Sequence, residues 1–455
     1  MKKRMCKIMA LAMTAAMVVP MAAQTTAFAA DDKEITYWNI AVESPDKDIV
    51  TAAVDKFNKE TKSGYTVNSV AIQNDTYKEK LVIAMSSGEC PDMYSSWSGG
   101  PMYEYIDSGF AQPIDDLLDQ SDVKDKLLDA AIEQGSYNGH VYAIPYLNVS
   151  LAGIFYNKDM FKQYGLEEPK TLADLENICA TLKENGITPF ALANASKWTG
   201  SMYFMSLAAR YGGLEPFQNA VAGTGKFTDD CFIKAGEKIQ EWVKNGYFPD
   251  GVNSLSEDDG QAKQLMYQET AGMLLCGSWY AGTFQTDSEE FYQKIGWFPF
   301  PAIDDSDADP TIQIGTVGDQ FISFNCEGDK LAAAFECATD HLSDEVEDMI
   351  YSTGKIAPVK DAGDHIKDPV VKEIFDAAQK ASSIQLWYDQ YLPTSVASAH
   401  LDGLQEVFGL TKTPQEAQEE MQKAMDEYLS TKSDSGAADD TAEEATDDAA
   451  ADDAE

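Results

Sequence analysis

The sequence predicts an α/β protein of two domains, or lobes, which the chain connects by extended crossovers. Residues 31–432 form the part expected to fold, and this length exceeds what a single hydrophobic core usually spans. Strand and helix patterns alternate from residue 35 onward, an order that favours parallel strands covered by helices. Within residues 139–161 the polar step Asn148-Val149-Ser150 separates two apolar runs, as expected where a strand leaves one lobe and enters the other.

Both ends of the chain differ in composition from a folded domain. Basic residues up to Lys7 precede an apolar run from Ile8 to about Ala23, and Ala27-Phe28-Ala29 follows as a cleavage pattern. Residues 1–30 therefore read as a secretory signal peptide. No cysteine lies just after that run, so we expect an exported protein, secreted or surface-associated, without a lipid anchor. Residues 433–455 contain ten acidic and no basic residues and predict a disordered tail.

Charge narrows the classes of partner. The formal net charge is −42, which speaks against nucleic acids and anionic membranes. Arg210 is the only arginine after the signal peptide, although arginine is the preferred side chain for carboxylates and phosphates. A neutral ligand is therefore favoured, while lysines or backbone amides could still serve a charged one. Six cysteines remain without metal-binding spacing, and those at helical apolar positions predict buried free thiols.

The first lobe is expected to open with the strand Ile35–Asn39, and Ser44-Pro45 marks the start of a helix over 46–61. Pro145 has no amide donor, so the strand at 141–146 must end there or lie at a sheet edge. A strand at 65–72, a helix over 77–85 and a short strand before Ser95 complete this part.

The second lobe should begin with the strand 151–156 and a helix that starts at Asn157. We expect strands at 189–192 and 273–276, and further strands at 296–301 and 321–325 that return to the first lobe. Helices are expected at 171–185, 201–211, 230–245, 256–269, 330–342, 345–353, 369–381, 395–408 and 414–432.

Three tryptophans share one setting, in which small polar residues and glycine surround the indole. They are Trp97, Trp198 and Trp279, and each follows a predicted strand or precedes a helix. An open indole face stacks on flat, weakly polar ligands such as sugar rings or nucleobases. A single loop tryptophan can simply fill a gap, but three in one setting favour a binding site. Trp242, by contrast, has the spacing of a core residue.

Polar side chains at the matching strand ends could bond ligand hydroxyls. The candidates are Asn39, Glu43, Asn148, Asp319, Asp389 and Gln390, each of which could equally be a solvated surface residue. Asp305-x-Asp307-x-Asp309 imitates a calcium loop, but Pro310 stands where that loop needs glycine. No HExxH, GxSxG, P-loop or GxGxxG motif occurs, so we expect no metal, no cofactor and no catalysis.

Four short motifs occur in a specific order. They are Tyr77-x-x-Lys-Leu81, Ser87-Gly-x-x-Pro-Asp-Met93, Gly139-x-Val-Tyr-Ala-Ile-Pro-Tyr146 and Phe155-Tyr-Asn-Lys-Asp-Met-Phe161. With Met273-x-Leu-x-Gly-Ser-Trp279, this order resembles carbohydrate-binding members of the bacterial extracellular solute-binding proteins, family 1. The resemblance extends over residues 33–432.

The resemblance implies a two-lobe periplasmic-binding-protein-like fold of type II, which closes on its ligand like a flytrap. By this analogy the N-terminal lobe comprises 31–147 plus 293–345, and the C-terminal lobe 148–292 plus 346–432. Crossovers would lie at about 147–151, 291–296 and 344–352. The implied protein is a monomeric, non-catalytic receptor that binds a neutral oligosaccharide and delivers it to the permease subunits of an ABC importer.

The resemblance also implies a set of ligand-binding residues. Trp198 and Trp279 would stack on sugar rings, and Tyr146 and Asn148 would bind at the first crossover. The others are Asn39, Glu43, Trp97, Ser98, Asp319, Trp387, Asp389 and Gln390. Two alternatives remain open: a secreted glycoside hydrolase with the same aromatic lining, and a receptor for a charged solute, which the single arginine disfavours.

Overall fold

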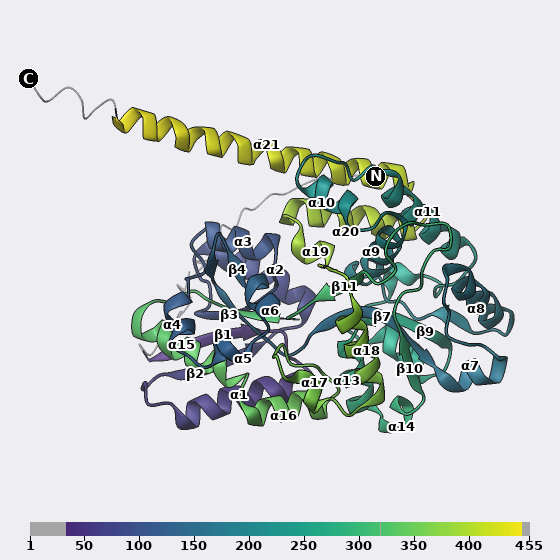
Figure 1. Ribbon diagram of the computed structural model, residues 1–455, viewed down its shortest axis with the longest axis horizontal. Helices are drawn as coiled ribbons and strands as arrows, with labels where there is room; N and C mark the ends of the chain where they lie inside the picture. Colours follow the sequence, from purple (N-terminus) through teal and green to yellow (C-terminus); the bar gives the residue numbers. More distant parts are fainter. Residues whose placement is uncertain (1–32, 319, 448–455) are drawn as a thin grey trace, which may run out of the picture.

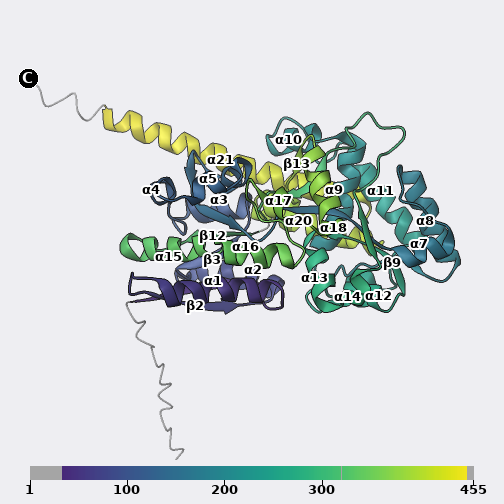
Figure 2. The ribbon, with the colours of Figure 1, turned by 60° about the horizontal axis from the view of Figure 1, so that its bottom comes forward.

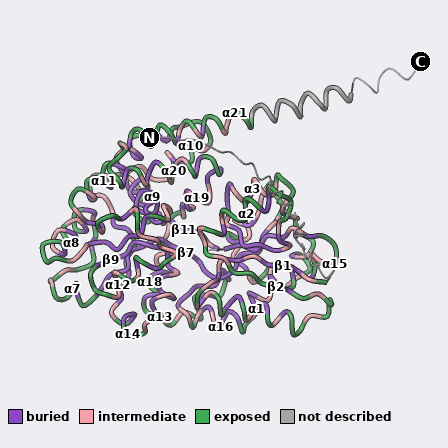
Figure 3. The backbone as a smooth tube through the Cα atoms, turned by 180° about the vertical axis from the view of Figure 1, so that it is seen from behind, coloured by how far each residue is buried: buried purple, intermediate pink, exposed green. Residues whose placement is uncertain are grey.

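The computed structural model describes residues 33–318 and 320–447, with side chains as far as residue 432. Two lobes lie side by side, each built around its own β-sheet with helices packed against it (Figure 1). The buried backbone is concentrated in these two sheets (Figure 3). The expected signal peptide, residues 1–30, and the candidate ligand residue Asp319 lie outside the described residues.

The first sheet has the strand order β2-β1-β3-β12-β6. As predicted, β1 pairs in parallel with β2 and β3, while β12 runs antiparallel to β3 and β6. Pro145 lies in β6 at the edge of the sheet, where its missing amide costs no ladder hydrogen bond. The strands are β1 (Glu34–Asn39), β2 (Thr66–Ala71), β3 (Met93–Ser96), β6 (Ala143–Tyr146) and β12 (Gln320–Phe324).

Helices cover this sheet and form its crossovers. The α1 helix buries the apolar stripe from Ile49 to Phe57 that its sequence spacing predicts, and it packs against α15 and α16. The helices of this lobe are α1 (Asp46–Glu60), α2 (Asn74–Ser87), α3 (Gly100–Asp107), α4 (Asp115–Asp119), α5 (Val123–Lys126), α6 (Asp129–Gln134), α15 (Gly328–Asp340) and α16 (Asp344–Ser352). A small hairpin joins β4 (Ser136–Tyr137) and β5 (His140–Val141).

The second sheet is centred on β7, whose eight residues are all buried. This explains why the run is apolar on both faces instead of alternating. Its strands are β7 (Ser150–Asn157), β8 (Thr188–Phe190), β9 (Ala271–Gly277), β10 (Ile295–Phe298), β11 (Gln313–Thr316) and β13 (Ile384–Gln385). Its helices are α7 (Lys158–Tyr164), α8 (Leu172–Glu184), α9 (Trp198–Gly212), α10 (Glu215–Val221), α11 (Asp230–Lys244), α12 (Gln261–Tyr267), α13 (Trp279–Asp287), α14 (Glu289–Tyr292), α18 (Pro369–Lys380), α19 (Tyr388–Tyr391), α20 (Thr394–Phe408) and α21 (Pro414–Asp447).

Two expectations about where the chain changes lobes are wrong. The strand expected at 296–301 in the first lobe is β10, which pairs with β7 in the second sheet, because its apolar residues are buried there. The return to the first sheet comes later, at β12. The α16 helix was expected in the C-terminal lobe, yet it packs on α1 of the first lobe (Figures 1 and 2). Its buried Glu347 pairs with Lys126 of that lobe at 3.0 Å.

The acidic tail also differs from the prediction, because α21 continues to Asp447 and therefore includes residues 433–447. The beginning of this helix is held by the packing of Ala417, Met421 and Met425 in the core. A helix that is already nucleated grows at little cost, and alanine and glutamate are good helix formers. The helix projects from the body toward the C-terminus (Figure 1).

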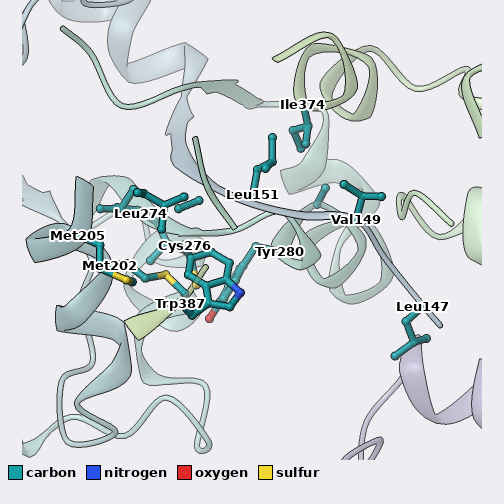
Figure 4. Packing of buried hydrophobic residues seen from close by; sticks show 14 of the residues in the cluster. Leu147, Val149, Leu151, Met202, Met205, Leu274, Cys276, Tyr280, Ile374 and Trp387 are labelled. Atoms are coloured by element: carbon teal, nitrogen blue, oxygen red, sulfur yellow. The ribbon is translucent and has the colours of Figure 1, made fainter. Parts of the chain in front are cut away.

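The two lobes are connected by buried crossing segments that bond to one another. Figure 4 shows the first of them, from Leu147 through Val149 to Leu151. The Val149 amide donates to the Ile356 carbonyl at 2.6 Å, and the Ile356 amide donates to Asn148 Oδ1 at 2.8 Å. Asn148 Nδ2 donates to Ser278 Oγ at 3.2 Å. The side chain of Asn148 therefore ties together three segments that are far apart in the sequence.

Replacing Asn148 with alanine should lower the free energy of unfolding by about 1–3 kcal/mol, because it leaves the buried Ile356 amide without its acceptor. Urea denaturation followed by circular dichroism measures this change. Asn68→Ala, at an exposed position of β2, serves as the control and should change stability little. Equal stabilities for the two variants would contradict a structural role for Asn148.

Candidate functional site

The lobes enclose a cleft that consists of two adjoining cavities of about 170 and 200 Å³. Both are lined by Ile40 and Asp46 of the first lobe and by Trp198 and Trp279 of the second, so the two cavities are continuous. The first-lobe walls follow the carboxyl ends of β1, β2 and β3, where polar loops of parallel strands gather at one sheet edge. The second-lobe walls are the beginnings of α9 and α13 and the segment before α19.

Four tryptophans line the cavity of about 170 Å³, which we call the tryptophan cavity. The ring centroids of Trp198 and Trp279 are 6.0 Å apart, and those of Trp279 and Trp387 are 6.1 Å apart. Trp97 lines the same cavity from the first lobe. The absence of a side chain at Gly277 is necessary, because a Cβ there would lie 2.0 Å from the Trp279 ring.

Met202 and Met205 of α9 complete the apolar lining behind these rings, and Figure 4 shows both beside Trp387. Trp387 is nearly buried, whereas Trp198 and Trp279 are half-buried. The three rings of the second lobe thus form a continuous aromatic wall, with the flexible thioethers filling the space behind it.

Carboxylates held by lysines provide the polar part of the cleft. Asp46, at the start of α1, lies 2.7 Å from the ammonium group of Lys355, which is only 2% exposed. Asp389 accepts from Lys78 at 3.2 Å across the two lobes, and Lys78 also lies 5.0 Å from the centre of the Trp97 ring. Each carboxylate pairs with one lysine, and its remaining lone pairs can accept hydrogen bonds from hydroxyl groups.

The structure thus brings seven of the predicted ligand residues to the cleft. Trp97, Trp198, Trp279, Trp387, Asp389 and Gln390 line the tryptophan cavity, and Glu43 lines the second cavity. Glu43 lies at the rim, where it pairs with Lys263 at 3.4 Å. Whether these residues bind a ligand remains a prediction, but their common location follows from the fold.

Four other predicted residues line neither cavity. Asn39 is buried and bonds Ser69 Oγ and the Ala41 amide. The buried hydroxyl of Tyr146 bonds Tyr37, Ser95 and Gln320. Asn148 is engaged at the crossing segments, so it does not face the cleft as expected. Ser98 lines a different cavity, described below. The polar groups of Asn39, Tyr146 and Asn148 thus bond other protein groups instead of facing a ligand.

The sequence interpretation missed several polar residues of the cleft. Asp46 was part of a predicted helix start, where acidic residues are common for electrostatic reasons alone. Lys355 precedes the crossing residue Ile356, and nothing local in the sequence marks it. Other missed polar residues of the two cavities include Asn74, Lys78, Gln320, Glu257, Asp258 and Lys263. Only Asn74 could have been found from the sequence, because it follows the parallel strand β2, and residues after parallel strands often line a binding site.

Arg210 takes no part in the cleft. Its guanidinium group is buried and donates to the carbonyl oxygens of Phe300, Pro301 and Ile312. Burial lowers the pKa of Arg210 to about 10. Among the described residues the cleft therefore has only lysines as cations, and Lys78, Lys263 and Lys355 are each paired with a carboxylate.

Other clusters in the described part of the chain offer little chemistry. Ser201 and His400 are hydrogen-bonded at 2.7 Å, but both are buried and His400 Nδ1 has no partner, so no catalytic triad forms. Within residues 33–318 and 320–447 no group of three or more His, Cys, Asp or Glu is placed to hold a metal ion. The six cysteines after the signal are free, and five of them are buried.

The carboxyl group of Glu257 in the second cavity has an unusual proton affinity. It accepts a hydrogen bond from the Tyr280 hydroxyl, and removal from water raises its pKa to about 7. Asp258 beside it and Asp75 of the first lobe act in the same direction, whereas the Tyr280 hydrogen bond and Lys263 oppose the shift. Part of the cleft therefore changes charge near neutral pH.

Comparison with known proteins identifies the family. Residues 41–338 match the family of bacterial extracellular solute-binding proteins. The chain belongs to this family. An uncharacterised ABC transporter extracellular-binding protein of Pyrococcus horikoshii is 29% identical over 62% of this chain and 64% of its own length. A multiple sugar-binding protein of Streptococcus mutans is 30% identical over 36% of this chain and 39% of its own length. The chain thus spans less than two thirds of these curated relatives.

Solved structures resemble the chain over nearly their whole length. One comes from work on xylan utilisation by the thermophilic bacterium Caldanaerobius polysaccharolyticus and is 29% identical, with a TM-score of 0.78. The match covers 86% of this chain and 99% of that chain. The α/β solute-binding fold expected from the sequence is confirmed. None of the helices within the described residues combines the length and apolar composition that a membrane crossing needs.

Changing Glu257 to glutamine should alter how stability depends on pH. The ordinary pKa is 4.5, so between that value and about 7 the carboxyl is ionised in the unfolded chain but protonated in the fold. The folded state then binds more protons, and the free energy of unfolding of the wild type falls as pH rises through this window. The advantage of wild type over Glu257→Gln should therefore decrease between pH 5 and 7.5.

Urea denaturation at several pH values measures this difference. Glu215→Gln, at an exposed position of α10, is the control and should follow the wild type at every pH. A constant difference between wild type and Glu257→Gln across this range would show that the Glu257 pKa is not raised.

Proposed function

We propose that this protein is the extracytoplasmic binding component of an ABC importer and that it captures a neutral sugar, an oligosaccharide, in the interlobe cleft. The observation that carries the proposal is the aromatic wall of Trp198, Trp279 and Trp387 beside lysine-held carboxylates. Its family membership and the similarity to a multiple sugar-binding protein support the same conclusion. Its partners would be the membrane permease subunits of that importer, and we propose that it acts as a monomer.

The chemistry of the cleft suits hydroxylated rings. Indole faces stack on the C–H faces of sugars, and carboxylates accept hydrogen bonds from ring hydroxyls. Asp46 and Asp389 can each accept a hydrogen bond from a hydroxyl group while they keep their ion pairs with Lys355 and Lys78. A few stacked rings and charge-assisted hydrogen bonds, less the cost of ordering the ligand, correspond to roughly micromolar affinity.

Contacts between the lobes support a mechanism of ligand-stabilised closure. The Asp75 amide donates to Asp258 Oδ2 at 3.1 Å, and Lys263 reaches Glu43, so first-lobe residues touch second-lobe residues around the cleft. A ligand that contacts both lobes favours this closed arrangement by its differential affinity. The permease would then recognise the closed form.

A glycoside hydrolase is the second candidate, and one observation favours it. Glu257 lies in the cleft with a pKa near 7, which is the property of a general acid in glycosidic cleavage. The test is whether xylo-, cello-, malto- and chitotetraose or stachyose yield shorter products during prolonged incubation. Shorter products from the wild type that are absent with Glu257→Gln would establish a hydrolase. If all sugars stay intact, the receptor function is supported instead.

Isothermal calorimetry with the same five oligosaccharides tests the proposal directly. We expect at least one to bind with roughly micromolar affinity, because the cleft offers stacking and hydroxyl acceptors together. Amino acids and citrate, as charged solutes, should neither bind nor compete. If the folded protein binds none of a broad neutral panel, or if citrate displaces the sugar, the proposal fails.

Trp198→Ala and Trp279→Ala should each weaken sugar binding at least about tenfold, because each removes a stacking face worth about 1.4 kcal/mol or more. Calorimetry on the tightest ligand of the panel measures the change. Tyr211→Ala alters a half-buried aromatic at the opposite end of α9 and should keep full affinity. Wild-type affinity in both tryptophan variants would place the ligand elsewhere.

A further inference from the structure

The two lobes touch through their backbones at one end of the tryptophan cavity. Gly99 and Gly100 begin α3 in the first lobe, and Gln390 to Leu392 end α19 in the second. A Cβ at Gly99 would lie 2.5 Å from the Gln390 carbonyl oxygen, and one at Gly100 would lie 2.3 Å from the Leu392 carbonyl oxygen. We call this contact the glycine junction; it leaves no space for a side chain.

A side chain holds the glycine junction in place. Glu104 of α3 accepts hydrogen bonds from the Thr394 amide at 3.0 Å and from its hydroxyl at 2.6 Å. Thr394 is the first residue of α20, so a carboxylate of the first lobe satisfies a free amide at a helix start of the second. The contact is therefore a specific one between the lobes.

The junction separates two cavities that lie between the lobes. Gln390 lines the tryptophan cavity, whereas its neighbour Tyr391 lines another cavity of about 380 Å³, together with Ser98 and Tyr103. In the other direction the tryptophan cavity continues past Trp198 and Trp279 into the second cavity. The rim there carries Glu43, whose side chain is 66% exposed. The cleft is thus blocked at one end and leads to solvent at the other.

We propose that the glycine junction is the closed end of the binding cleft and makes the protein specific for one terminus of an oligosaccharide. The terminal ring lies against Trp387 and Gln390, and the following rings run past the Trp198–Trp279 pair toward Glu43. Internal stretches of a longer chain are excluded, because the chain cannot pass the junction. This inference rests on the proposed function.

End-modified sugars test the inference on the wild-type protein. For each tetrasaccharide of the panel that binds, two derivatives are compared, one with an O-benzyl group on the ring at one end and one with the group at the other end. One derivative should lose at least 100-fold in affinity, and the other should stay within threefold of the unmodified sugar. Two unaffected derivatives, or two that fail, would overturn the inference while leaving sugar binding intact. No binding by any unmodified sugar would overturn the proposed function first, and this inference with it.

A variant of the junction provides a second, independent measurement. Gly100→Ala should weaken binding of the unmodified sugar at least tenfold, because its Cβ cannot coexist with the Leu392 carbonyl when the lobes close. Gly100 lines neither cavity of the cleft, and without ligand the thermal midpoint should remain that of the wild type. Ser108→Ala, just after the far end of α3, is the control with wild-type affinity. Wild-type affinity in Gly100→Ala would show that the junction is absent from the bound state, and the inference would fail.

Discussion

The reciprocal hydrogen bonding of the two crossing segments determines where the walls of the cleft stand. Val149 and Asn148 bond Ile356 in both directions, and Asn148 also bonds Ser278. The next residue after Ser278 is Trp279, and the residue before Ile356 is Lys355. One buried amide therefore fixes the aromatic wall and the buried cation relative to each other, although they come from different parts of the sequence.

Charged groups of the cleft are positioned by these crossing segments. Lys355 is almost inaccessible to water, so Asp46 must accompany it, since an unpaired buried ammonium group would be costly. The pair places a carboxylate acceptor where both cavities meet. With Arg210 bound to backbone carbonyls, no guanidinium fork of the described chain reaches the cleft for a carboxylate ligand. The composition of the chain favours a neutral ligand because arginine is scarce. The geometry of the cleft favours the same kind of ligand, because the one arginine of the folded part is bound elsewhere.

Candidate site residues could be predicted from the sequence where the side chain and its neighbours in the sequence determine whether it faces the cleft. Trp97, Trp198 and Trp279 stand among glycine and small polar residues, which leave an indole face open in almost any packing. Asn39 and Asn148 are different, because a polar side chain at a strand end can bond either a ligand or the protein. Ser69 and Ile356 supply the protein partners, and neither can be recognised as such from local sequence.

The sequence alone determined the α/β class, the parallel start of the first sheet, the restriction of Pro145 to a strand end or a sheet edge, and the order of the long helices. These features depend on residue periodicity and on local covalent constraints, such as the missing amide of proline. Tertiary structure alone decided that β10 joins β7, that α16 stays on the first lobe, and that the Gly99–Gly100 backbone meets α19. Such pairings join strands and helices that are distant along the chain. For each element several partners of similar hydrophobicity are available. Only the folded packing selects among them.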